Sequence, residues 1–304
     1  MKQFVEKMFF SPQWYHYPFI VILLPFSWLY GFGMGVRRGL AKPVSYGLPV
    51  VSVGNLIVGG SGKTPFVIAL ASRYEDVAVI SRGYGRKSTG LVEVSNRGQI
   101  LADVTQSGDE AILMALSLSN ASVIVCEDRH EAIKLAKEKG AKVIVLDDGF
   151  NRVDLEKFDI LLEPRHIQNC YTFPSGPFRE FLGTRKHADL IAKEDKMFTR
   201  VVSIEDATDK MLLATAISNP KRLDRFLPKE VVGKVYYDDH AYFDEKVLSK
   251  LLEENKATSI LCTSKDRVKM QGFKLAISEM KLKLEIKKEI FTHVDAYVKG
   301  YEYA

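Results

Sequence analysis

The segment Val50–Pro65 constrains the fold of this chain more than any other. A short, mostly β-branched run, Val50–Val53, leads directly into a glycine-rich loop that ends in Gly62-Lys63-Thr64-Pro65. A strand, a glycine-rich loop and a helix start are typical of a phosphate-binding loop. The glycines leave backbone N–H groups free to wrap phosphate oxygens, and the helix dipole favours the anion. The segment therefore predicts an α/β sheet with a nucleotide at its carboxyl edge.

The loop supplies candidate ligands for ATP and Mg²⁺. Lys63 would reach the β- and γ-phosphates, and the Thr64 hydroxyl would ligate Mg²⁺. The usual pattern has its first glycine at the position that Ile57 occupies, and here the glycines are shifted towards the helix. A glycine-rich turn without function is the alternative interpretation. The other candidate cofactor-binding residues are Gly59, Gly60, Ser61, Gly62 and Arg82.

Two aspartates follow another predicted strand. The apolar run Val143–Leu146 ends in Asp147 and Asp148. A buried strand that ends in aspartate is the usual second half of a phosphate-loop site, where the carboxylate holds Mg²⁺ directly or through water. We expect Asp147 to be the Mg²⁺ partner and Asp148 to lie beside it in an orienting role. Aspartates are also common in loops without such a function.

Apolar runs alternate with helix-like segments along the first two thirds of the chain. The strand candidates are 50–53, 77–80, 122–125, 142–146, 159–162 and 189–192, and the helix candidates are 65–73, 109–118 and 129–139. This alternation predicts a P-loop NTPase-like α/β fold, with a mostly parallel sheet flanked by helices.

A weaker pattern begins near Ile204. It has strand candidates at 212–216, 234–237 and 259–262, a helix candidate at 244–254, and an alternating run at 281–288 that favours a further strand. We therefore expect three parts: an N-terminal membrane-anchoring segment at 1–46, a P-loop core at 47–203 and a smaller C-terminal α/β lobe at 204–304.

The N-terminal region is apolar. Tyr17–Val36 is close to the length that a helix needs to cross the hydrocarbon core. Pro18 and Pro25 interrupt it, which leaves open a spanning helix and a helix lying in the interface. A cleaved signal peptide and a buried core helix are the alternatives. Trp14 and Tyr15 are of the aromatic type found at membrane interfaces, and Arg37, Arg38 and Lys42 would hold the end of the segment on the cytoplasmic side.

Composition limits the partners and the compartment. The net charge of +5 is a small, scattered excess of bases, which does not indicate nucleic acid. Cys126, Cys170 and Cys262 form no CxxC pair, which argues against a disulfide framework and a structural zinc site. We expect no nucleic acid partner, no obligate protein partner and a reducing compartment for the globular part.

The ordered set of motifs resembles the tetraacyldisaccharide 4'-kinase family, the lipid A 4'-kinases. The motifs are VGNLIVGGSGKTP at 53–65, SRGYGRK at 81–87, SGDEAILMA at 107–115, LDDGF at 146–150, PSGPFREFL at 174–182, AISNPKRL at 216–223, DDHAYF at 238–243 and TSKDRVK at 263–269. The resemblance implies an ATP-dependent lipid kinase of lipid A biosynthesis. Its acceptor would be the 4'-hydroxyl of a tetraacylated glucosamine disaccharide 1-phosphate, on the cytoplasmic face of the inner membrane, with inner-membrane lipid as a partner.

The resemblance carries roles over to particular residues. Asp109 and His240 resemble the catalytic aspartate and its histidine partner, and with Lys63 they form the expected catalytic set. Such a pair would take the proton of the attacking hydroxyl. Without the resemblance, Asp109 would be a helix N-cap and His240 a surface histidine. Arg179 and Glu180 resemble the acceptor-binding region, where they would meet a phosphate and sugar hydroxyls; a surface ion pair is the alternative.

Two positions depart from the common family pattern. Asn151 stands where glutamine often follows DDGF, and Ala241 stands where a second histidine often follows the first. Asn151, a candidate substrate-binding residue, has the shorter polar arm. Ala241 removes a possible relay residue. Neither change deletes a member of the expected catalytic set.

Three other classes of protein fit part of the sequence. One is a membrane-associated P-loop ATPase or GTPase that couples hydrolysis to transport or insertion, although Thr263–Asp266 has the wrong spacing for a guanine-recognition motif. A membrane scaffold with a regulatory nucleotide site would not need Asp109 or His240. A kinase of a soluble small molecule would gain nothing from the apolar N-terminal segment.

Overall fold

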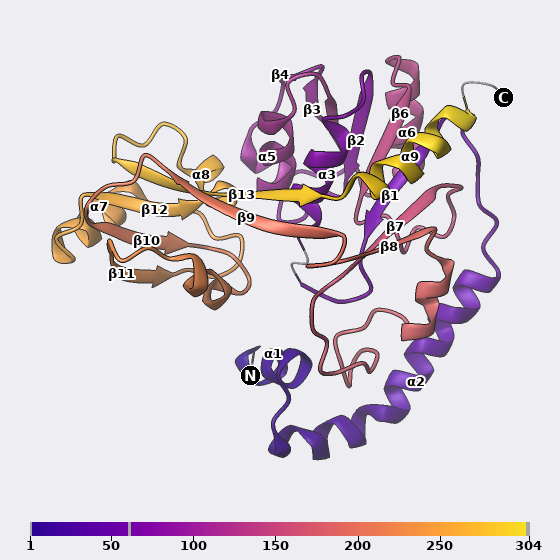
Figure 1. The fold of residues 1–304 in the computed structure, drawn as a ribbon, viewed down its shortest axis with the longest axis horizontal. Coiled ribbons are helices and arrows are strands. Elements are labelled where there is room, and N and C mark those ends of the chain that lie inside the picture. The colour runs from indigo at the N-terminus through magenta and orange to yellow at the C-terminus, as the bar shows by residue number, and fades with distance from the viewer. Residues whose placement is uncertain (1, 60–61, 302–304) are drawn as a thin grey trace. The chain divides into compact units, whose positions relative to one another are not determined.

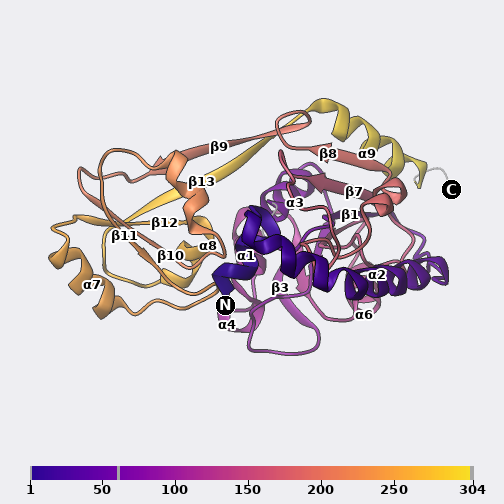
Figure 2. The ribbon, with the colours of Figure 1, turned by 90° about the horizontal axis from the view of Figure 1, so that it is seen from below.

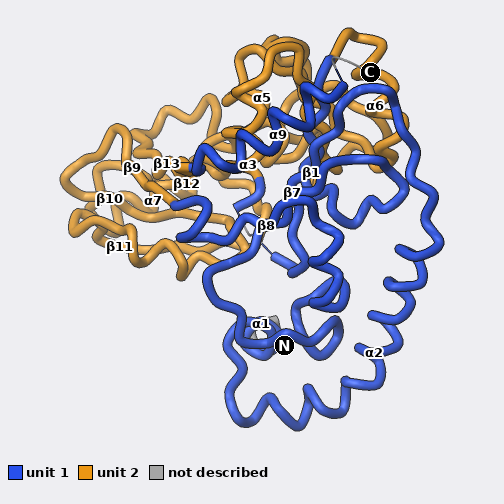
Figure 3. The backbone as a smooth tube through the Cα atoms, turned by 45° about the vertical axis from the view of Figure 1, so that its right-hand side comes forward, with its two compact units in different colours: residues 1–63, 142–199, 286–304 blue, residues 64–141, 200–285 orange. Residues whose placement is uncertain are grey.

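The chain folds into two compact units, each assembled from separate stretches of sequence. The computed structural model describes residues 2–59 and 62–301. Unit 1 contains residues 1–63, 142–199 and 286–304, and unit 2 contains residues 64–141 and 200–285 (Figure 3).

Unit 1 is built on four parallel strands. They are β1 (Val50–Gly54), β6 (Val143–Asp147), β7 (Phe158–Glu163) and β8 (Leu190–Lys193), in the order β6-β1-β7-β8. Every residue of β1 and β6 is buried, which explains why both strands are short and apolar. Val53 pairs with Asp147, so the phosphate loop and the acidic residues leave the sheet at the same level.

The helices of unit 1 come from both ends of the chain. They are α1 (Lys2–Phe10), η1 (Trp14–His16), α2 (Tyr17–Gly39), η2 (Leu182–His187) and α9 (Lys288–Gly300). Figure 1 draws α2 as one unbroken helix. Pro18 stands in its first turn, where proline is tolerated, and Pro25 lies inside the helix without ending it. Tyr297 of α9 packs against the ring of Phe158, with the centroids 5.2 Å apart.

Unit 2 begins with a second set of strands and helices. Its strands are β2 (Val77–Ser81), β3 (Val92–Asn96), β4 (Gln99–Ile100) and β5 (Ser122–Val125). β2 and β5 are parallel, whereas β3 pairs antiparallel with both β4 and β5. The helices are α3 (Lys63–Ala71), which starts at the end of unit 1, α4 (Val104–Ser107), α5 (Asp109–Ser117) and α6 (Arg129–Glu138).

Unit 2 also contains a five-stranded sheet. Its order is β11-β10-β12-β13-β9, and its strands are β9 (Phe198–Glu205), β10 (Met211–Thr215), β11 (Val231–Tyr236), β12 (Ser259–Thr263) and β13 (Ile277–Ile286). Figure 2 shows β9 and β13 side by side. Separate apolar clusters contain Leu212 and Leu213, successive residues of β10 that point to opposite faces. The helices are η3 (Pro220–Phe226), α7 (Glu245–Glu254), α8 (Ser264–Arg267) and η4 (Val268–Met270).

The predicted fold class is confirmed: the chain is α/β, with a large, mostly parallel sheet flanked by helices. All six strand candidates of the first two thirds are strands. The sequence did not predict β3, β4 or β9. β4 is only two residues long, and β9 alternates between half-buried and exposed residues, with only Phe198 buried. The division at residues 47–203 and 204–304 stays a prediction.

Candidate active site

The first half of the phosphate loop is fixed by a strand-like contact within unit 1. The Val58 N–H donates to the Pro177 carbonyl at 2.9 Å, and the Arg179 N–H donates to the Leu56 carbonyl at 2.7 Å. Between them, Ile57 forms a β-bridge with Phe178. Extended backbone with a packed side chain does not need glycine, which explains why the glycines of this loop lie nearer to the helix.

The second half of the loop carries the lysine. Gly59 and Gly62 have φ values of +92° and +80°, a region that favours glycine. Lys63 Nζ lies 3.2 Å from Oδ1 of Asn55 and 3.5 Å from Oδ1 of Asp148. Its side chain is therefore held beside the loop. Gly60 and Ser61, two predicted cofactor-binding residues, lie outside the described residues. Thr64 is the second residue of α3.

The acidic loop, residues 147–151, begins at Asp147, the last residue of β6. Asp147 is buried, and the Asp148 N–H donates to the Val53 carbonyl at 2.9 Å. Asp148 has φ of +56° and its Oδ2 accepts from Arg179 Nη1 at 2.8 Å. Burial raises the pKa of Asp148, but the positive charges of Lys63 and Arg179 outweigh this effect and hold the pKa below its usual range. The loop thus presents an ionised carboxylate between two cations.

The phosphate loop and the acidic loop approach each other closely. A Cβ atom on Gly54 would lie 2.5 Å from Phe150 Cβ and 2.9 Å from the Phe150 backbone nitrogen. Phe150 is buried in a cluster with Leu56, Leu161 and Phe178. Gly54 is therefore required by the path of the neighbouring chain, in addition to any contact with phosphate.

The predicted substrate-binding residues have different surroundings. Arg179 contacts Asp148, as described above. Glu180 is buried, and its carboxylate accepts from Nε and Nη2 of Arg38 at 2.9 and 3.0 Å. The Asn151 carbonyl accepts from Arg37 Nη2 at 2.8 Å. The sequence indicated Arg37 and Arg38 only as the basic flank of an apolar helix, so it missed their contacts with this loop.

Unit 2 brings Asp109 and His240 together. Both carboxylate oxygens of Asp109, the first residue of α5, lie 3.0 Å from His240 Nδ1. His240 has φ of +62°, and its backbone N–H donates to the Ala216 carbonyl at the end of β10. The ring of Tyr84 lies beside the imidazole, with the centroids 5.0 Å apart. The aspartate orients the ring through Nδ1 and leaves Nε2 on its other side.

Two lysines flank this pair, and no role was predicted for either of them from the sequence. Lys265 Nζ lies 3.8 Å from Asp109 Oδ2 and 3.5 Å from His240 Nε2. Lys269 Nζ lies 3.5 Å from Asp109 Oδ2 and 3.4 Å from Oδ1 of Asp266. Burial raises the pKa of Asp109, but the hydrogen bond with His240 and the charge of Lys265 oppose it, and the net pKa is lowered. Asp109 is therefore an anion at neutral pH.

Asp266 anchors the second lysine. It is fully buried, its Oδ1 accepts from the Ala216 N–H at 3.0 Å, and its Oδ2 accepts from the hydroxyls of Thr215 and Thr263 at 2.6 and 2.7 Å. These bonds join the carboxyl ends of β10 and β12. The motif TSKDRVK contained the signal, because a lysine three residues after a buried aspartate on a helical turn faces that aspartate.

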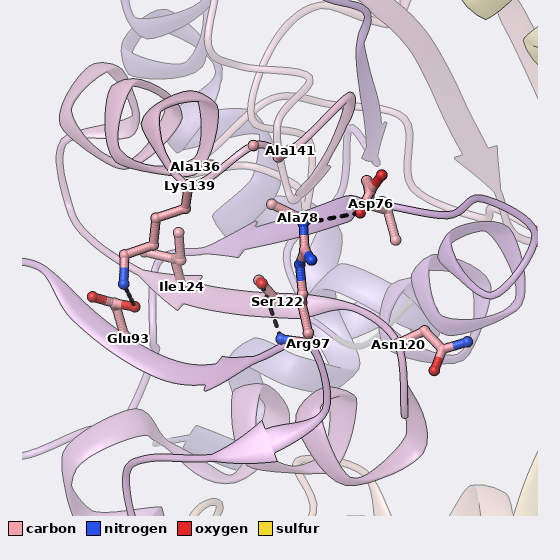
Figure 4. Close-up of a pocket in the computed structure, with 12 residues that line it drawn as sticks. Asp76, Ala78, Glu93, Arg97, Asn120, Ser122, Ile124, Ala136, Lys139 and Ala141 are labelled. Carbon is pink, nitrogen blue, oxygen red and sulfur yellow. Dashed lines mark hydrogen bonds and ion pairs between the residues drawn. The ribbon is translucent and has the colours of Figure 1, made fainter.

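Arg82 directly follows β2, and its side chain is exposed. Its predicted contact with phosphate stays a prediction. A small hollow lies elsewhere in unit 2, at the amino ends of β2 and β5 (Figure 4). Its volume of 10 Å³ suits about one water molecule. Its charged residues pair with one another: Asp76 with Arg97 at 3.1 Å, and Glu93 with Lys139 at 2.5 Å. The hollow is not a candidate active site.

The strand, the glycine loop and the lysine beside a buried acidic loop define a nucleotide-binding α/β protein of the phosphate-loop class. The carboxylate–imidazole pair of unit 2 adds a candidate acid–base centre. The family model described as Tetraacyldisaccharide-1-P 4'-kinase matches residues 19–299. The chain belongs to that family.

Similar proteins agree with this assignment over nearly the whole chain. A tetraacyldisaccharide 4'-kinase of Helicobacter pylori (strain HPAG1) is 48% identical over 302 residues, covering 99% of this chain and 96% of the relative. The tetraacyldisaccharide 4'-kinase of Aliarcobacter butzleri (strain RM4018) is 42% identical, with 98% of each chain covered. The crystal structure of "apo" form LpxK from Aquifex aeolicus in complex with ATP superimposes with a TM-score of 0.78 at 27% identity. It covers 92% of this chain and 99% of that one.

Proposed function

We propose that this protein transfers the γ-phosphate of ATP to the 4'-hydroxyl of a tetraacylated glucosamine disaccharide 1-phosphate, a step of lipid A biosynthesis. Family membership supports the reaction, and the contact between Asp109 and His240 is the observation that carries it. A protein that only binds nucleotide needs a phosphate loop but no oriented acid–base pair. A kinase needs both, because the acceptor hydroxyl must lose its proton.

The phosphate loop binds the nucleotide in this proposal. Backbone N–H groups around Gly59–Gly62 and the N-terminus of α3 meet the phosphates. The Lys63 amine, 3.5 Å from Asp148, meets the γ-phosphate while it stays beside that carboxylate. Asp148 and Asn55 hold the lysine beside the loop beforehand, which reduces the entropy lost when phosphate binds.

Mg²⁺ fits the acidic end of β6 by the chemistry of its donors. Among residues 2–59 and 62–301, no group of three or more His, Cys, Asp or Glu side chains is arranged to hold a metal. Mg²⁺ at a nucleotide site uses one or two carboxylates and completes its shell with phosphate and water. Asp147 and the Thr64 hydroxyl would supply hard oxygen ligands, while Asp148 stays engaged with Lys63 and Arg179. The ion would supply neutralisation of the phosphate charge.

The Asp109–His240 pair accepts the proton. The acceptor O4' forms a bond to the γ-phosphorus as the bond from that phosphorus to the β,γ-bridging oxygen breaks, and ADP leaves. The proton of O4' passes to the pair, and the Asp109 carboxylate stabilises the positive charge that the proton adds. Lys265 and Lys269 keep Asp109 ionised, so the imidazole stays oriented through Nδ1.

Helix α2 holds the protein on the cytoplasmic face of the inner membrane. The stretch Trp14–Gly39 is long and apolar enough to cross a bilayer, although length and composition do not separate a spanning helix from one that lies in the interface. Ser27 exchanges hydrogen bonds with Thr172 at 2.9 and 2.8 Å, and the Ser175 hydroxyl donates to the Ile20 carbonyl at 3.0 Å. These contacts with residues 172–175, together with the basic residues at the end of the helix, favour a helix that lies in the interface.

The test is transfer of label from γ-labelled ATP into the acceptor lipid, with purified protein in detergent and Mg²⁺. Lys63→Ala should abolish transfer. Asp109→Asn and His240→Ala should lower kcat by about 10²–10⁴-fold without weakening ATP binding. Asp128→Asn, which alters only the N-cap of α6, is the matched control for the aspartate change. Label released as free phosphate would indicate the coupled ATPase. Bound nucleotide without turnover would indicate the scaffold.

A further inference from the structure

Arg38 is only partly exposed at the end of α2, where the sequence predicted a basic residue that holds this end of the helix on the cytoplasmic side. Its side chain is 13% exposed, and it makes a two-point contact with the carboxylate of Glu180. Nη2 also donates to the Phe150 carbonyl at 3.3 Å, and the guanidinium lies 4.8 Å from the centre of the Phe150 ring. Only a planar guanidinium can make these contacts together, so a lysine would not replace it.

The partners of Arg38 lead into the phosphate site. Phe150 is the fourth residue of the acidic loop. Glu180 is the chain neighbour of Arg179, whose guanidinium binds Asp148 at 2.8 Å. Asp148 in turn lies 3.5 Å from Lys63 Nζ. A continuous set of polar contacts and peptide links therefore runs from α2 to the lysine of the phosphate loop, entirely within unit 1.

Helix α2 is fixed to the protein by one narrow face only. Its buried residues are Ile20, Ser27 and Gly31, and a Cβ on Gly31 would lie 2.5 Å from the Phe181 ring. Large apolar side chains on its other faces are more than half exposed: Phe19, Val21, Ile22, Phe26, Trp28, Leu29 and Phe32. A lipid surface is the occupant that suits this face, because aromatic residues and the exposed Lys42 flank it.

We propose that Arg38 is a positioning residue of the phosphate site. It holds the acidic loop so that Asp148 meets Lys63 and Arg179, and it ties this arrangement to α2 lying on a lipid surface. When lipid covers the apolar face, α2 keeps its place and the acidic loop keeps its conformation. Without lipid, the apolar side chains of α2 are exposed to water, which weakens the hold of the helix on the protein. Arg38 then no longer supports the acidic loop. The inference rests on the membrane location proposed above.

The experiment measures the affinity for a fluorescent ATP analogue with Mg²⁺, before and after adding vesicles of phosphatidylethanolamine and phosphatidylglycerol that contain no acceptor. We expect the vesicles to tighten binding by the wild type by about fivefold or more. Arg38→Met should bind about tenfold more weakly and should not respond to vesicles. Arg38→Lys, which keeps the charge, should resemble Arg38→Met. Lys250→Met, which removes a charge from the exposed pair with Glu254 on α7, should resemble the wild type.

Two controls separate positioning from other effects. Co-sedimentation with the vesicles should be the same for the wild type and for Arg38→Lys. If Arg38→Met does not fold, Glu180→Gln replaces it, because it keeps the shape of the partner and removes its charge. Wild-type ATP affinity in these variants would overturn the proposal, as would a variant that loses only vesicle binding. The titration needs no acceptor, so it gives its answer even if lipid phosphorylation is not observed.

Discussion

Both carboxylate oxygens of Asp109 lie 3.0 Å from Nδ1 of His240, and Lys269 Nζ lies 3.5 Å from Oδ2 of the same carboxylate. The aspartate therefore contacts a cation and an imidazole at once, and its side chain is 3% exposed. The same contacts that hold the carboxylate in place also lower its pKa and keep it ionised.

Asp109 should make the stability of the protein depend on acid pH. Burial raises its pKa, but the contacts with His240, Lys265 and Lys269 outweigh this effect and hold the pKa below the ordinary value of 3.8. A carboxylate with a depressed folded pKa stabilises the fold above its unfolded pKa, and the contribution is lost as the pH falls through the folded pKa. Asp109→Asn should remove this part of the pH dependence below 3.8. Denaturant unfolding at a series of acid pH values checks it. Parallel curves for variant and wild type would contradict it.

Lys269→Met should destabilise unit 2 strongly. The amine is 1% exposed and lies between the carboxylates of Asp109 and Asp266. Its removal leaves two buried anions without their shared cation, at a cost of about 3 kcal/mol or more in the free energy of unfolding. Urea unfolding of unit 2, followed by a probe in that unit, measures the change. The control is Lys250→Met, which breaks an exposed pair with Glu254 and should cost less than about 0.5 kcal/mol.

Gly54→Ala should weaken ATP binding and lower stability. The added Cβ would meet both Cβ and the backbone nitrogen of Phe150, and neither atom can move without the acidic loop. Overpacking of this kind costs about 1–3 kcal/mol. Thermal unfolding and nucleotide titration check the two effects. Gly39→Ala, where nothing lies within 4 Å of the new Cβ, is the matched control. Equal behaviour of the two variants would show that the close approach is unimportant.

Two glycines of α2 should respond differently to alanine. At Gly31 the new Cβ would lie 2.5 Å from the Phe181 ring, whereas at Gly33 nothing lies within 4 Å. Gly31→Ala should loosen α2, and limited proteolysis in detergent should cut it faster. Gly33→Ala should be neutral or stabilise the helix by up to about 1 kcal/mol. If Gly31→Ala leaves proteolysis unchanged, the packing of α2 on Phe181 contributes nothing to its attachment.

The sequence predicted the fold class because buried parallel strands leave a strong local signal. Val50–Val53 and Val143–Leu146 are apolar, short and followed by the residues of the loops, so their place in a sheet was readable. Contacts between distant segments were not readable. Nothing near Glu180 in the sequence indicates that Arg38 binds it, and nothing near Asp109 points to Lys269. The residues of the phosphate loop were predicted by motif, but the extended backbone at Ile57 depends on its pairing with Phe178.

The order in which unit 1 is assembled from the chain has a consequence during synthesis. Its helix α2 leaves the ribosome long before the segment with Thr172 and Ser175 that fixes it, and α9, whose Tyr297 packs on Phe158, leaves later still. Unit 1 therefore cannot close until α9 has been made, and α2 has no protein partner until residues 172–175 have followed it. In the membrane location proposed above, a bilayer that α2 meets early would cover its exposed apolar side chains while the rest of unit 1 is still being made.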